Sequence, residues 1–185
     1  MEMVVMNMCD VELVRRFVKD GNDKAFAEVV NRYERVLKKY ATRLCNGDSH
    51  LAEDVVQETF LRAFIALATF REEAKLSTWL HSIAFNCAMA LFRKNKMQVC
   101  CLDEMVELVD VMQDIEKVDA SYDLEHAINS IAAPQQNVFY ICVVDGYSHE
   151  QAAVITGIPL GTVKTNVRRT KHKLKEYLRA WGEAA

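Results

Sequence analysis

Six polar or basic side chains near the C-terminus have the types and spacing to contact DNA. They recur on one side of a predicted helix, and they are Thr162, Lys164, Thr165, Arg168, Arg169 and His172. The other side of that helix carries a ladder at three- and four-residue steps, formed by Val163, Val167, Thr170, Leu174 and Leu178. Short polar residues followed by Arg and Lys suit a helix in a major groove, where the first meet base edges and the second meet phosphates.

The residues just before this helix predict the element that positions it. Ser148 and Gln151 have the spacing of a capping box, which would start a short helix. Gly157 can supply a left-handed corner about two turns later, and Pro159 lies near the first position of the next helix. These signals in one register predict a helix-turn-helix, whereas a basic face alone would suit an ordinary solvated helical hairpin.

Charge is distributed unevenly along the chain of 185 residues, whose net charge is −3. Residues 98–120 contain seven acidic residues and one Lys, and residues 160–181 contain seven Lys or Arg and one Glu. The small net charge of the whole chain therefore results from a basic helix and an acidic connector whose charges nearly cancel. Apolar residues in the connector, such as Leu108 and Ile115, indicate that it docks on another surface rather than staying fully solvated.

Composition predicts an all-α fold, because the chain has only six Gly and two Pro and no alternation of strand and helix patterns. We expect two small helical domains joined by the acidic linker. No apolar run is long enough to span a bilayer, and the segment from Met1 to Asp10 is a poor signal peptide. We therefore expect a cytoplasmic protein without membrane insertion.

Apolar periodicity predicts four helices in the first module. We expect them at Val11–Val18, at Phe26–Leu44 with Asp23 as the cap, at Leu51–Ala68, and at Ser77–Lys94. The inward positions that we predict include Val18, Val36, Phe60 and Phe64, and Trp79 is expected to be a core residue rather than a stacking platform. The second module, residues 121–181, is expected to contain a helix from Pro134 through Val138–Val144 before the helix-turn-helix.

The cysteines and histidines do not have the spacing of a catalytic or metal site. There is no C-x-x-C pattern, and Cys100 and Cys101 are too close for ordinary disulfide geometry. We expect reduced thiols, several of them buried, and leave open a redox role for Cys100 and Cys101. No cofactor, no metal and no enzymatic activity are predicted.

Three motifs resemble the extracytoplasmic-function group of the sigma-70 family. LAEDVVQETFLRAF at residues 51–64 resembles the L-A-E-D-x-x-Q-E-x-F segment of sigma factors, and FREEAKLSTWLHSI at 70–83 resembles the stretch that follows it there. GTVKT at 161–165 is similar to the G-T-V-K-[ST] of the C-terminal helix-turn-helix. The resemblance covers nearly the whole chain apart from the connector.

The resemblance implies a role for each part of the chain. Residues 1–97 would be a region 2-like domain, 98–120 the linker, and 121–185 a region 4-like domain that binds the upstream promoter element. Core RNA polymerase would bind Glu53, Asp54, Gln57, Glu58 and Arg62. The melted downstream element would be held by Arg71, Lys75, Asn86, Arg93, Lys94 and Lys96, and the recognition helix would use Gly161 together with the six residues named first. The family also implies an anti-sigma partner and a linker that occupies the polymerase channel.

Some positions depart from the family pattern. Ala90 and Leu91 stand where many relatives carry Asp and Arg, and no Arg follows Pro134 at the usual distance. Gln151 stands where Glu is commoner. The alternative function is a stand-alone helix-turn-helix repressor or activator, which would bind duplex DNA without polymerase.

Overall fold

The computed structural model describes residues 8–100, 131 and 133–182, and divides the chain into two compact units, 1–99 and 100–185. Every regular element in the described ranges is helical, which confirms the all-α prediction. Most of the predicted connector, 98–120, lies outside the described residues, so its role as a linker stays a prediction.

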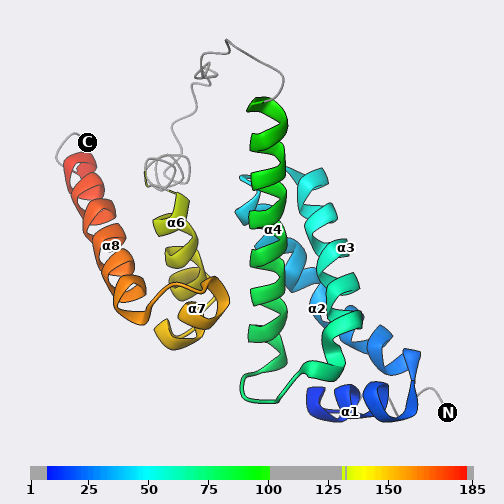
Figure 1. The fold of residues 1–185 in the computed structure, drawn as a ribbon. Coiled ribbons are helices and arrows are strands. Elements are labelled where there is room, and N and C mark those ends of the chain that lie inside the picture. Colours follow the sequence, from blue (N-terminus) through cyan, green and yellow to red (C-terminus); the bar gives the residue numbers. More distant parts are fainter. Residues whose placement is uncertain (1–7, 101–130, 132, 183–185) are drawn as a thin grey trace. The chain divides into compact units, whose positions relative to one another are not determined.

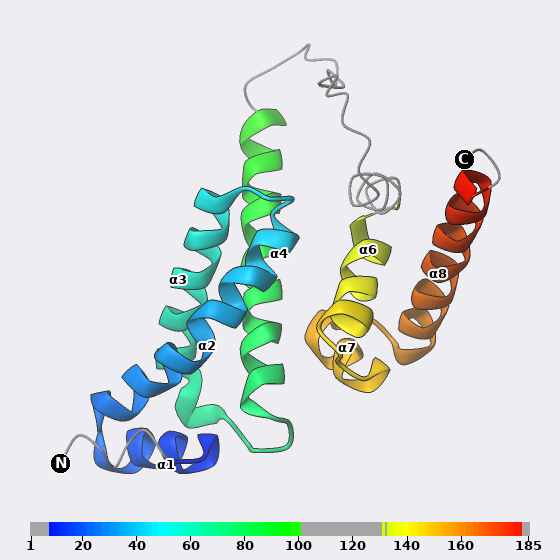
Figure 2. The ribbon, with the colours of Figure 1, turned by 180° about the vertical axis from the view of Figure 1, so that it is seen from behind.

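The first unit is a helical bundle. It consists of α1 (Asp10–Asp20), α2 (Asp23–Leu44), α3 (Ser49–Ala66), the short 3₁₀ helix η1 (Leu67–Thr69) and α4 (Leu76–Cys100). Figures 1 and 2 show α4 beside α2 and α3, with α1 crossing one end. The core is apolar and fully buried at positions such as Leu37, Val55 and Leu80, none of which is exposed to solvent.

The ends of the helices in this unit follow local capping rules. Gly21 adopts φ 60° and donates its N–H to the Phe17 carbonyl, which ends α1 as predicted. The predicted cap of α2 was wrong by one residue, because the Asn22 side chain, and not Asp23, accepts the N–H of Lys24 at 3.1 Å. Asp48 caps α3 through the N–H of Leu51.

Several inward positions were predicted wrongly. Val18 and Val36 are 44% and 48% exposed, whereas Leu13 of α1 and Leu37 of α2 are fully buried. Phe64 is also 44% exposed, but its ring packs against Phe17 at the margin of the bundle, with centroids 5.0 Å apart. A periodic pattern identifies the apolar side of a helix but not which of its residues lie at the edge of the core.

Two buried polar residues of this unit, Thr59 and His81, contact backbone carbonyls of their own helices. The Thr59 hydroxyl donates to the Val55 carbonyl at 2.6 Å, so a polar residue occupies the core side of α3 without an unpaired group. His81 is 1% exposed, with Nδ1 2.7 Å from the Ser77 carbonyl and its ring on Tyr40. The periodicity of apolar residues did not reveal either position.

The second unit consists of α6 (Ala133–Phe139), a π-helical turn η2 (Tyr140–Val144), α7 (His149–Thr156) and α8 (Leu160–Gly182). Figure 1 shows α6 and α8 joined through α7. The helix predicted through Val138–Val144 therefore changes type after Phe139. Its backbone widens there, and the Asp145 N–H bonds to the carbonyl of Tyr140, five residues earlier.

Candidate nucleic-acid and protein interfaces

The predicted helix-turn-helix is present as α7 and α8. The Ser148 hydroxyl accepts the Gln151 N–H at 3.2 Å, and the Gln151 side chain accepts the Ser148 N–H at 2.9 Å, which completes the capping box. Gly157 ends α7 at φ 70°, and Pro159 directly precedes α8. The ladder Val163, Val167, Thr170 and Leu174 is buried, together with Asn166, which the ladder did not include. The Leu178 side chain lies outside the described residues.

The opposite side of α8 is open to solvent. All of the predicted recognition residues are exposed, namely Gly161, Thr162, Lys164, Thr165, Arg168, Arg169 and His172. The Thr165 hydroxyl donates to the Gly161 carbonyl at 2.8 Å, which leaves its methyl group and oxygen lone pairs for a ligand. His172 Nδ1 lies 3.3 Å from a carboxylate oxygen of Glu176, one turn further along α8. The face presents donors at its start and positive charge behind them.

The loop before α4 is held in place by contacts distant in the sequence. Glu72 adopts φ 60°, a left-handed conformation that is rare for a residue with a side chain. Its carboxylate accepts two hydrogen bonds from Arg15, at 3.2 and 3.0 Å. Phe70 packs on Trp79 with ring centroids 5.3 Å apart, and Trp79 is half-buried. These contacts fix the loop that exposes Arg71 and Lys75, and the sequence patterns indicated neither Arg15 nor Glu72.

Further predicted DNA contacts lie along α4. Asn86 and Arg93 are exposed and seven residues apart, so two helical turns place them on one face, with Lys94 beside Arg93. Lys96 lies on the same helix, but its side chain is outside the described residues. The stripe consists of an amide followed by cations, which suits a base edge followed by backbone phosphates.

The acidic face of α3 is partly neutralised by neighbouring cations. Lys38 of α2 donates to Glu53 at 2.6 Å, and this bond, reinforced by the positive charge, holds the pKa of Glu53 below its usual value. Arg62 donates to Glu58 at 2.6 Å one turn away. Asp54 and Gln57 are exposed and have no such partner among the described residues. Asp54 therefore carries the unpaired negative charge of this face.

A groove of about 480 Å³ separates this face from α4. Asp54, Gln57, Glu58, Leu61 and Arg62 line one side, and Cys87, Ala90, Leu91 and Lys94 line the other. Four of the five predicted polymerase-binding residues thus border one groove, and the fifth, Glu53, lies outside it. Leu61 and Ile65 of α3 are 57% and 73% exposed, so apolar area lies next to the acids. Ala90 and Leu91, the departures from the family pattern, form part of the groove wall.

The thiols that the structure describes are free. Cys45 and Cys87 are buried and Cys9 is exposed. Burial raises the pKa of Cys45 to about 11, and it also raises the pKa of Cys87. Neither buried thiol ionises near neutral pH, as expected of cysteines that serve as small core residues. The side chains of Cys100 and Cys101 lie outside the described residues.

The described residues contain neither a metal-binding cluster nor a membrane-spanning helix. No group of three or more His, Cys, Asp or Glu side chains there could hold a metal ion. In the same part of the chain, no helix has the length and apolar character needed to cross a membrane.

Comparison with known proteins decides the family. Residues 29–97 match the family model described as Sigma-70 region 2, and residues 121–174 match Sigma-70, region 4. The sigma-E factor of Salmonella typhimurium is 30% identical over 181 residues, which cover 90% of this chain and 93% of that protein. The chain belongs to the extracytoplasmic-function (ECF) sigma factors of the sigma-70 family.

Other relatives of this ECF sigma factor agree. SigW of Bacillus subtilis is 29% identical over 88% of this chain and 93% of its own. The sigma factor RpoE of Bartonella quintana, solved in complex with the anti-sigma factor NepR, superposes with a TM-score of 0.68 at 28% identity, and covers 84% of this chain and 98% of that one. As a family member, this sigma factor binds core RNA polymerase and directs it to promoters. The family matches favour this function over a stand-alone repressor.

Proposed function

We propose that the two units divide promoter recognition between them, with polymerase binding assigned to the first. Residues 1–97 would hold core polymerase and the melted downstream element, and residues 121–185 would read the upstream element as duplex. The observation that carries the proposal is the separation of two kinds of exposed surface: an acidic and apolar face on α3, and a basic face on α8 opposite a buried ladder.

Polymerase binding is assigned to the α3 face that borders the groove. Asp54 and Gln57 offer an unpaired carboxylate and an amide, while Leu61 adds exposed apolar area. A basic partner would be oriented by the acids and held by the apolar contact, because charge contributes more to on-rate and specificity than to affinity. Glu53, Glu58 and Arg62 would have to exchange their present ion pairs for contacts with the partner.

Capture of the melted strand is assigned to the loop and stripe that lead into and along α4. The left-handed conformation of Glu72 and its bond to Arg15 present the loop in one shape, as a pocket for an unstacked base requires. The loop exposes two cations, Arg71 and Lys75, and α4 exposes Asn86 farther along the chain. The phosphates of the melted strand would be bound by Arg93, Lys94 and Lys96.

Control by an anti-sigma factor is proposed from the Bartonella quintana structure, in which a sigma factor of this fold is bound to NepR. The chain would act in the cytoplasm, where the polymerase and promoter DNA are located, and without enzymatic activity of its own. The acidic segment 98–120 would enter the polymerase channel in the holoenzyme, since seven acidic residues and one Lys can imitate nucleic acid.

The test is binding of the full chain to core RNA polymerase, with the wild type compared to Asp54→Lys/Glu58→Lys. We expect saturable binding by the wild type and loss of binding by the double variant, because the charge that attracts a basic partner is reversed. Asp20→Lys/Asp23→Lys is the matched control. It makes the same change of charge at exposed positions of α1 and α2, away from the groove.

Equal loss of binding in both double variants would mean that net charge, rather than the α3 face, determines binding. Full binding by Asp54→Lys/Glu58→Lys would refute the assignment of this face. Circular dichroism of each variant checks that the helices remain, since all four positions are on helices.

A further inference from the structure

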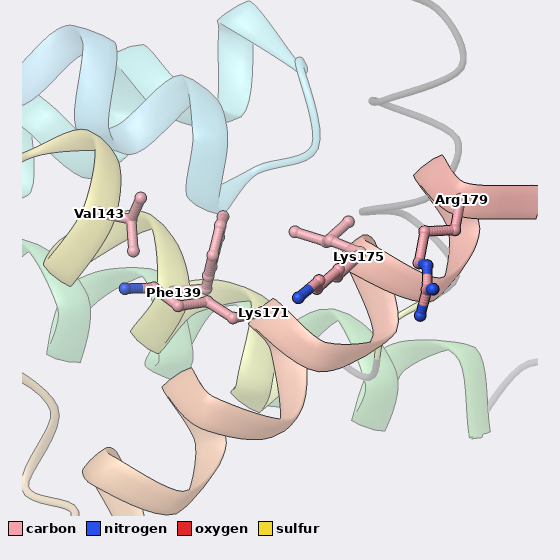
Figure 3. A pocket seen from close by; sticks show the side chains of 6 residues that line it. Phe139, Val143, Lys171, Lys175 and Arg179 are labelled. Atoms are coloured by element: carbon pink, nitrogen blue, oxygen red, sulfur yellow. The ribbon is translucent and has the colours of Figure 1, made fainter. Parts of the chain in front are cut away.

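The second unit has a shallow groove whose lining contains none of the predicted recognition residues. It has a volume of about 400 Å³ and is lined by Phe139, Val143 and Leu174 together with Lys171, Lys175 and Arg179. Figure 3 shows these side chains, which come from the α6–η2 segment and from α8. The three cations follow one another at four-residue steps along α8, so they form one row beside an apolar floor.

The π-helical turn contributes to the apolar floor. Val143 lies in η2 and is 44% exposed, whereas Phe139 and Leu174 beneath it are only 7% and 8% exposed. None of the three cations forms an ion pair with another described residue. The groove thus combines uncovered apolar area with unpaired positive charge, and the ligand that fits it has an apolar stripe with acidic residues around it.

The chain itself contains a segment of this kind. Between residues 102 and 118, Met105, Val109 and Met112 are spaced by four and three, with Leu108 and Ile115 on the same side of a helical projection. Acidic residues occupy 103, 107, 110 and 114 on the other side. Glu104 borders the apolar stripe, and Glu116 falls within it near the C-terminal end of the segment. Residues 102–118 have six acidic residues and one Lys, so their charge is opposite to that of the groove rim.

The point of attachment favours this segment over a separate molecule. The chain re-enters the described part at Ile131, which is 4% exposed and packs in one cluster with Phe139 and Leu174, two residues of the groove floor. Twelve residues lie between position 118 and Ile131, so the thirteen steps from one to the other span at most about 45 Å. A tethered segment reaches a nearby surface at a high effective concentration, which a free partner would have to match.

We propose that, in the absence of polymerase, residues 102–118 dock their apolar stripe on the groove of Phe139, Val143 and Leu174, with their acids near Lys171, Lys175 and Arg179. The docked segment would offset part of the positive field of α8, the helix that also carries the recognition residues. It would thereby weaken DNA binding by the free sigma factor until polymerase draws the acidic segment away. This inference goes beyond promoter recognition and concerns the state before the holoenzyme forms.

The test is hydrogen–deuterium exchange of residues 102–118 in the full chain without polymerase. We expect these amides to be protected in the wild type and to lose roughly tenfold of that protection in Val143→Asp, because a carboxylate in the groove would be buried against apolar atoms and face an acidic segment. Val154→Asp is the matched control, since Val154 is 60% exposed on α7 and does not line the groove. Protection of α7 and α8 amides reports whether each variant is folded.

Three outcomes would overturn the proposal. The first is exchange of residues 102–118 at the rate of an unstructured peptide in the wild type. The second is equal loss of protection in Val143→Asp and Val154→Asp. The third is protection that disappears on dilution, which would identify a second copy of the chain as the source of the protection. None of these depends on polymerase, so the outcome is separate from that of the polymerase-binding experiment.

Discussion

Two glycines of the helix-turn-helix are expected to respond to the same substitution with opposite signs. Gly157 has φ 70° and ψ 10°, and its N–H bonds to the Ala153 carbonyl at 2.9 Å. Gly161 lies inside the first turn of α8 and is not among the glycines with positive φ. A Cβ added at either position would meet no atom within 4 Å, so sterics beyond the residue itself do not contribute.

The expected magnitudes follow from the backbone alone. Gly157→Ala should lower the free energy of unfolding of the second unit by about 1–2 kcal/mol, the cost of a left-handed conformation with a Cβ. Gly161→Ala should raise it by about 0.5–1 kcal/mol, because alanine loses less backbone entropy in a helix than glycine. Gly157→Asn should cost less than Gly157→Ala, since Asn tolerates the left-handed region.

Amide exchange of α7 and α8 in the full chain measures these changes in the second unit separately from the first. A shift of the same sign for both alanine variants would refute the reasoning, as would an Asn variant that is less stable than the Ala variant at position 157. Holoenzyme binding to promoter DNA adds a second comparison. A Gly161→Ala chain that is more stable but binds promoters less tightly would indicate close approach of DNA to this backbone.

Three further changes test other contacts. Ser148→Ala should lower the stability of α7 by about 0.5–2 kcal/mol, measured by the same exchange, because alanine lacks the hydroxyl that accepts the Gln151 N–H at the start of the helix. Arg168→Ala in the holoenzyme should reduce the slope of log affinity against log salt by about 0.9 if the side chain contacts one phosphate; an unchanged slope would exclude that contact. Burial raises the pKa of Cys45 from 9.0 to about 11, so its contribution to folding stability is complete below pH 9.0 and is lost between these values. The free energy of unfolding of the Cys45→Ala variant should therefore fall less steeply with rising pH in that window than that of the wild type. In the native chain, a thiol reagent should modify the exposed Cys9 long before the buried Cys45.

The features predicted correctly from the sequence are those determined within a few residues. The capping box, the corner at Gly157 and the buried ladder of α8 all depend on spacings of three or four, and each is present in the structure. The same is true of the helix ending at Gly21. In these cases the backbone conformation and its hydrogen bonds are set by the local residue types.

The features that were missed depend on tertiary contacts. Periodicity placed Val36 inside because it follows the apolar pattern of α2, but exposure depends on which neighbouring helix covers that position. One contact of the loop before α4 joins Glu72 to Arg15, which is 57 residues away in the sequence. At Tyr140–Val144 the backbone changes from α-helical to π-helical winding, and no residue pattern in this segment predicted that change.

Ion pairing on α3 shows why a list of acidic residues is a poor description of a docking face. Glu53, Asp54 and Glu58 look equivalent in the sequence, yet Glu53 is bound to Lys38 and Glu58 to Arg62. A basic partner must compete with an existing cation at Glu53 and Glu58, whereas at Asp54 it displaces only water. Exposed ion pairs contribute little to stability, so such exchange is energetically possible. The unpaired carboxylate nevertheless offers the partner the larger net gain, and for that reason Asp54 is the residue on which the polymerase contact should depend most.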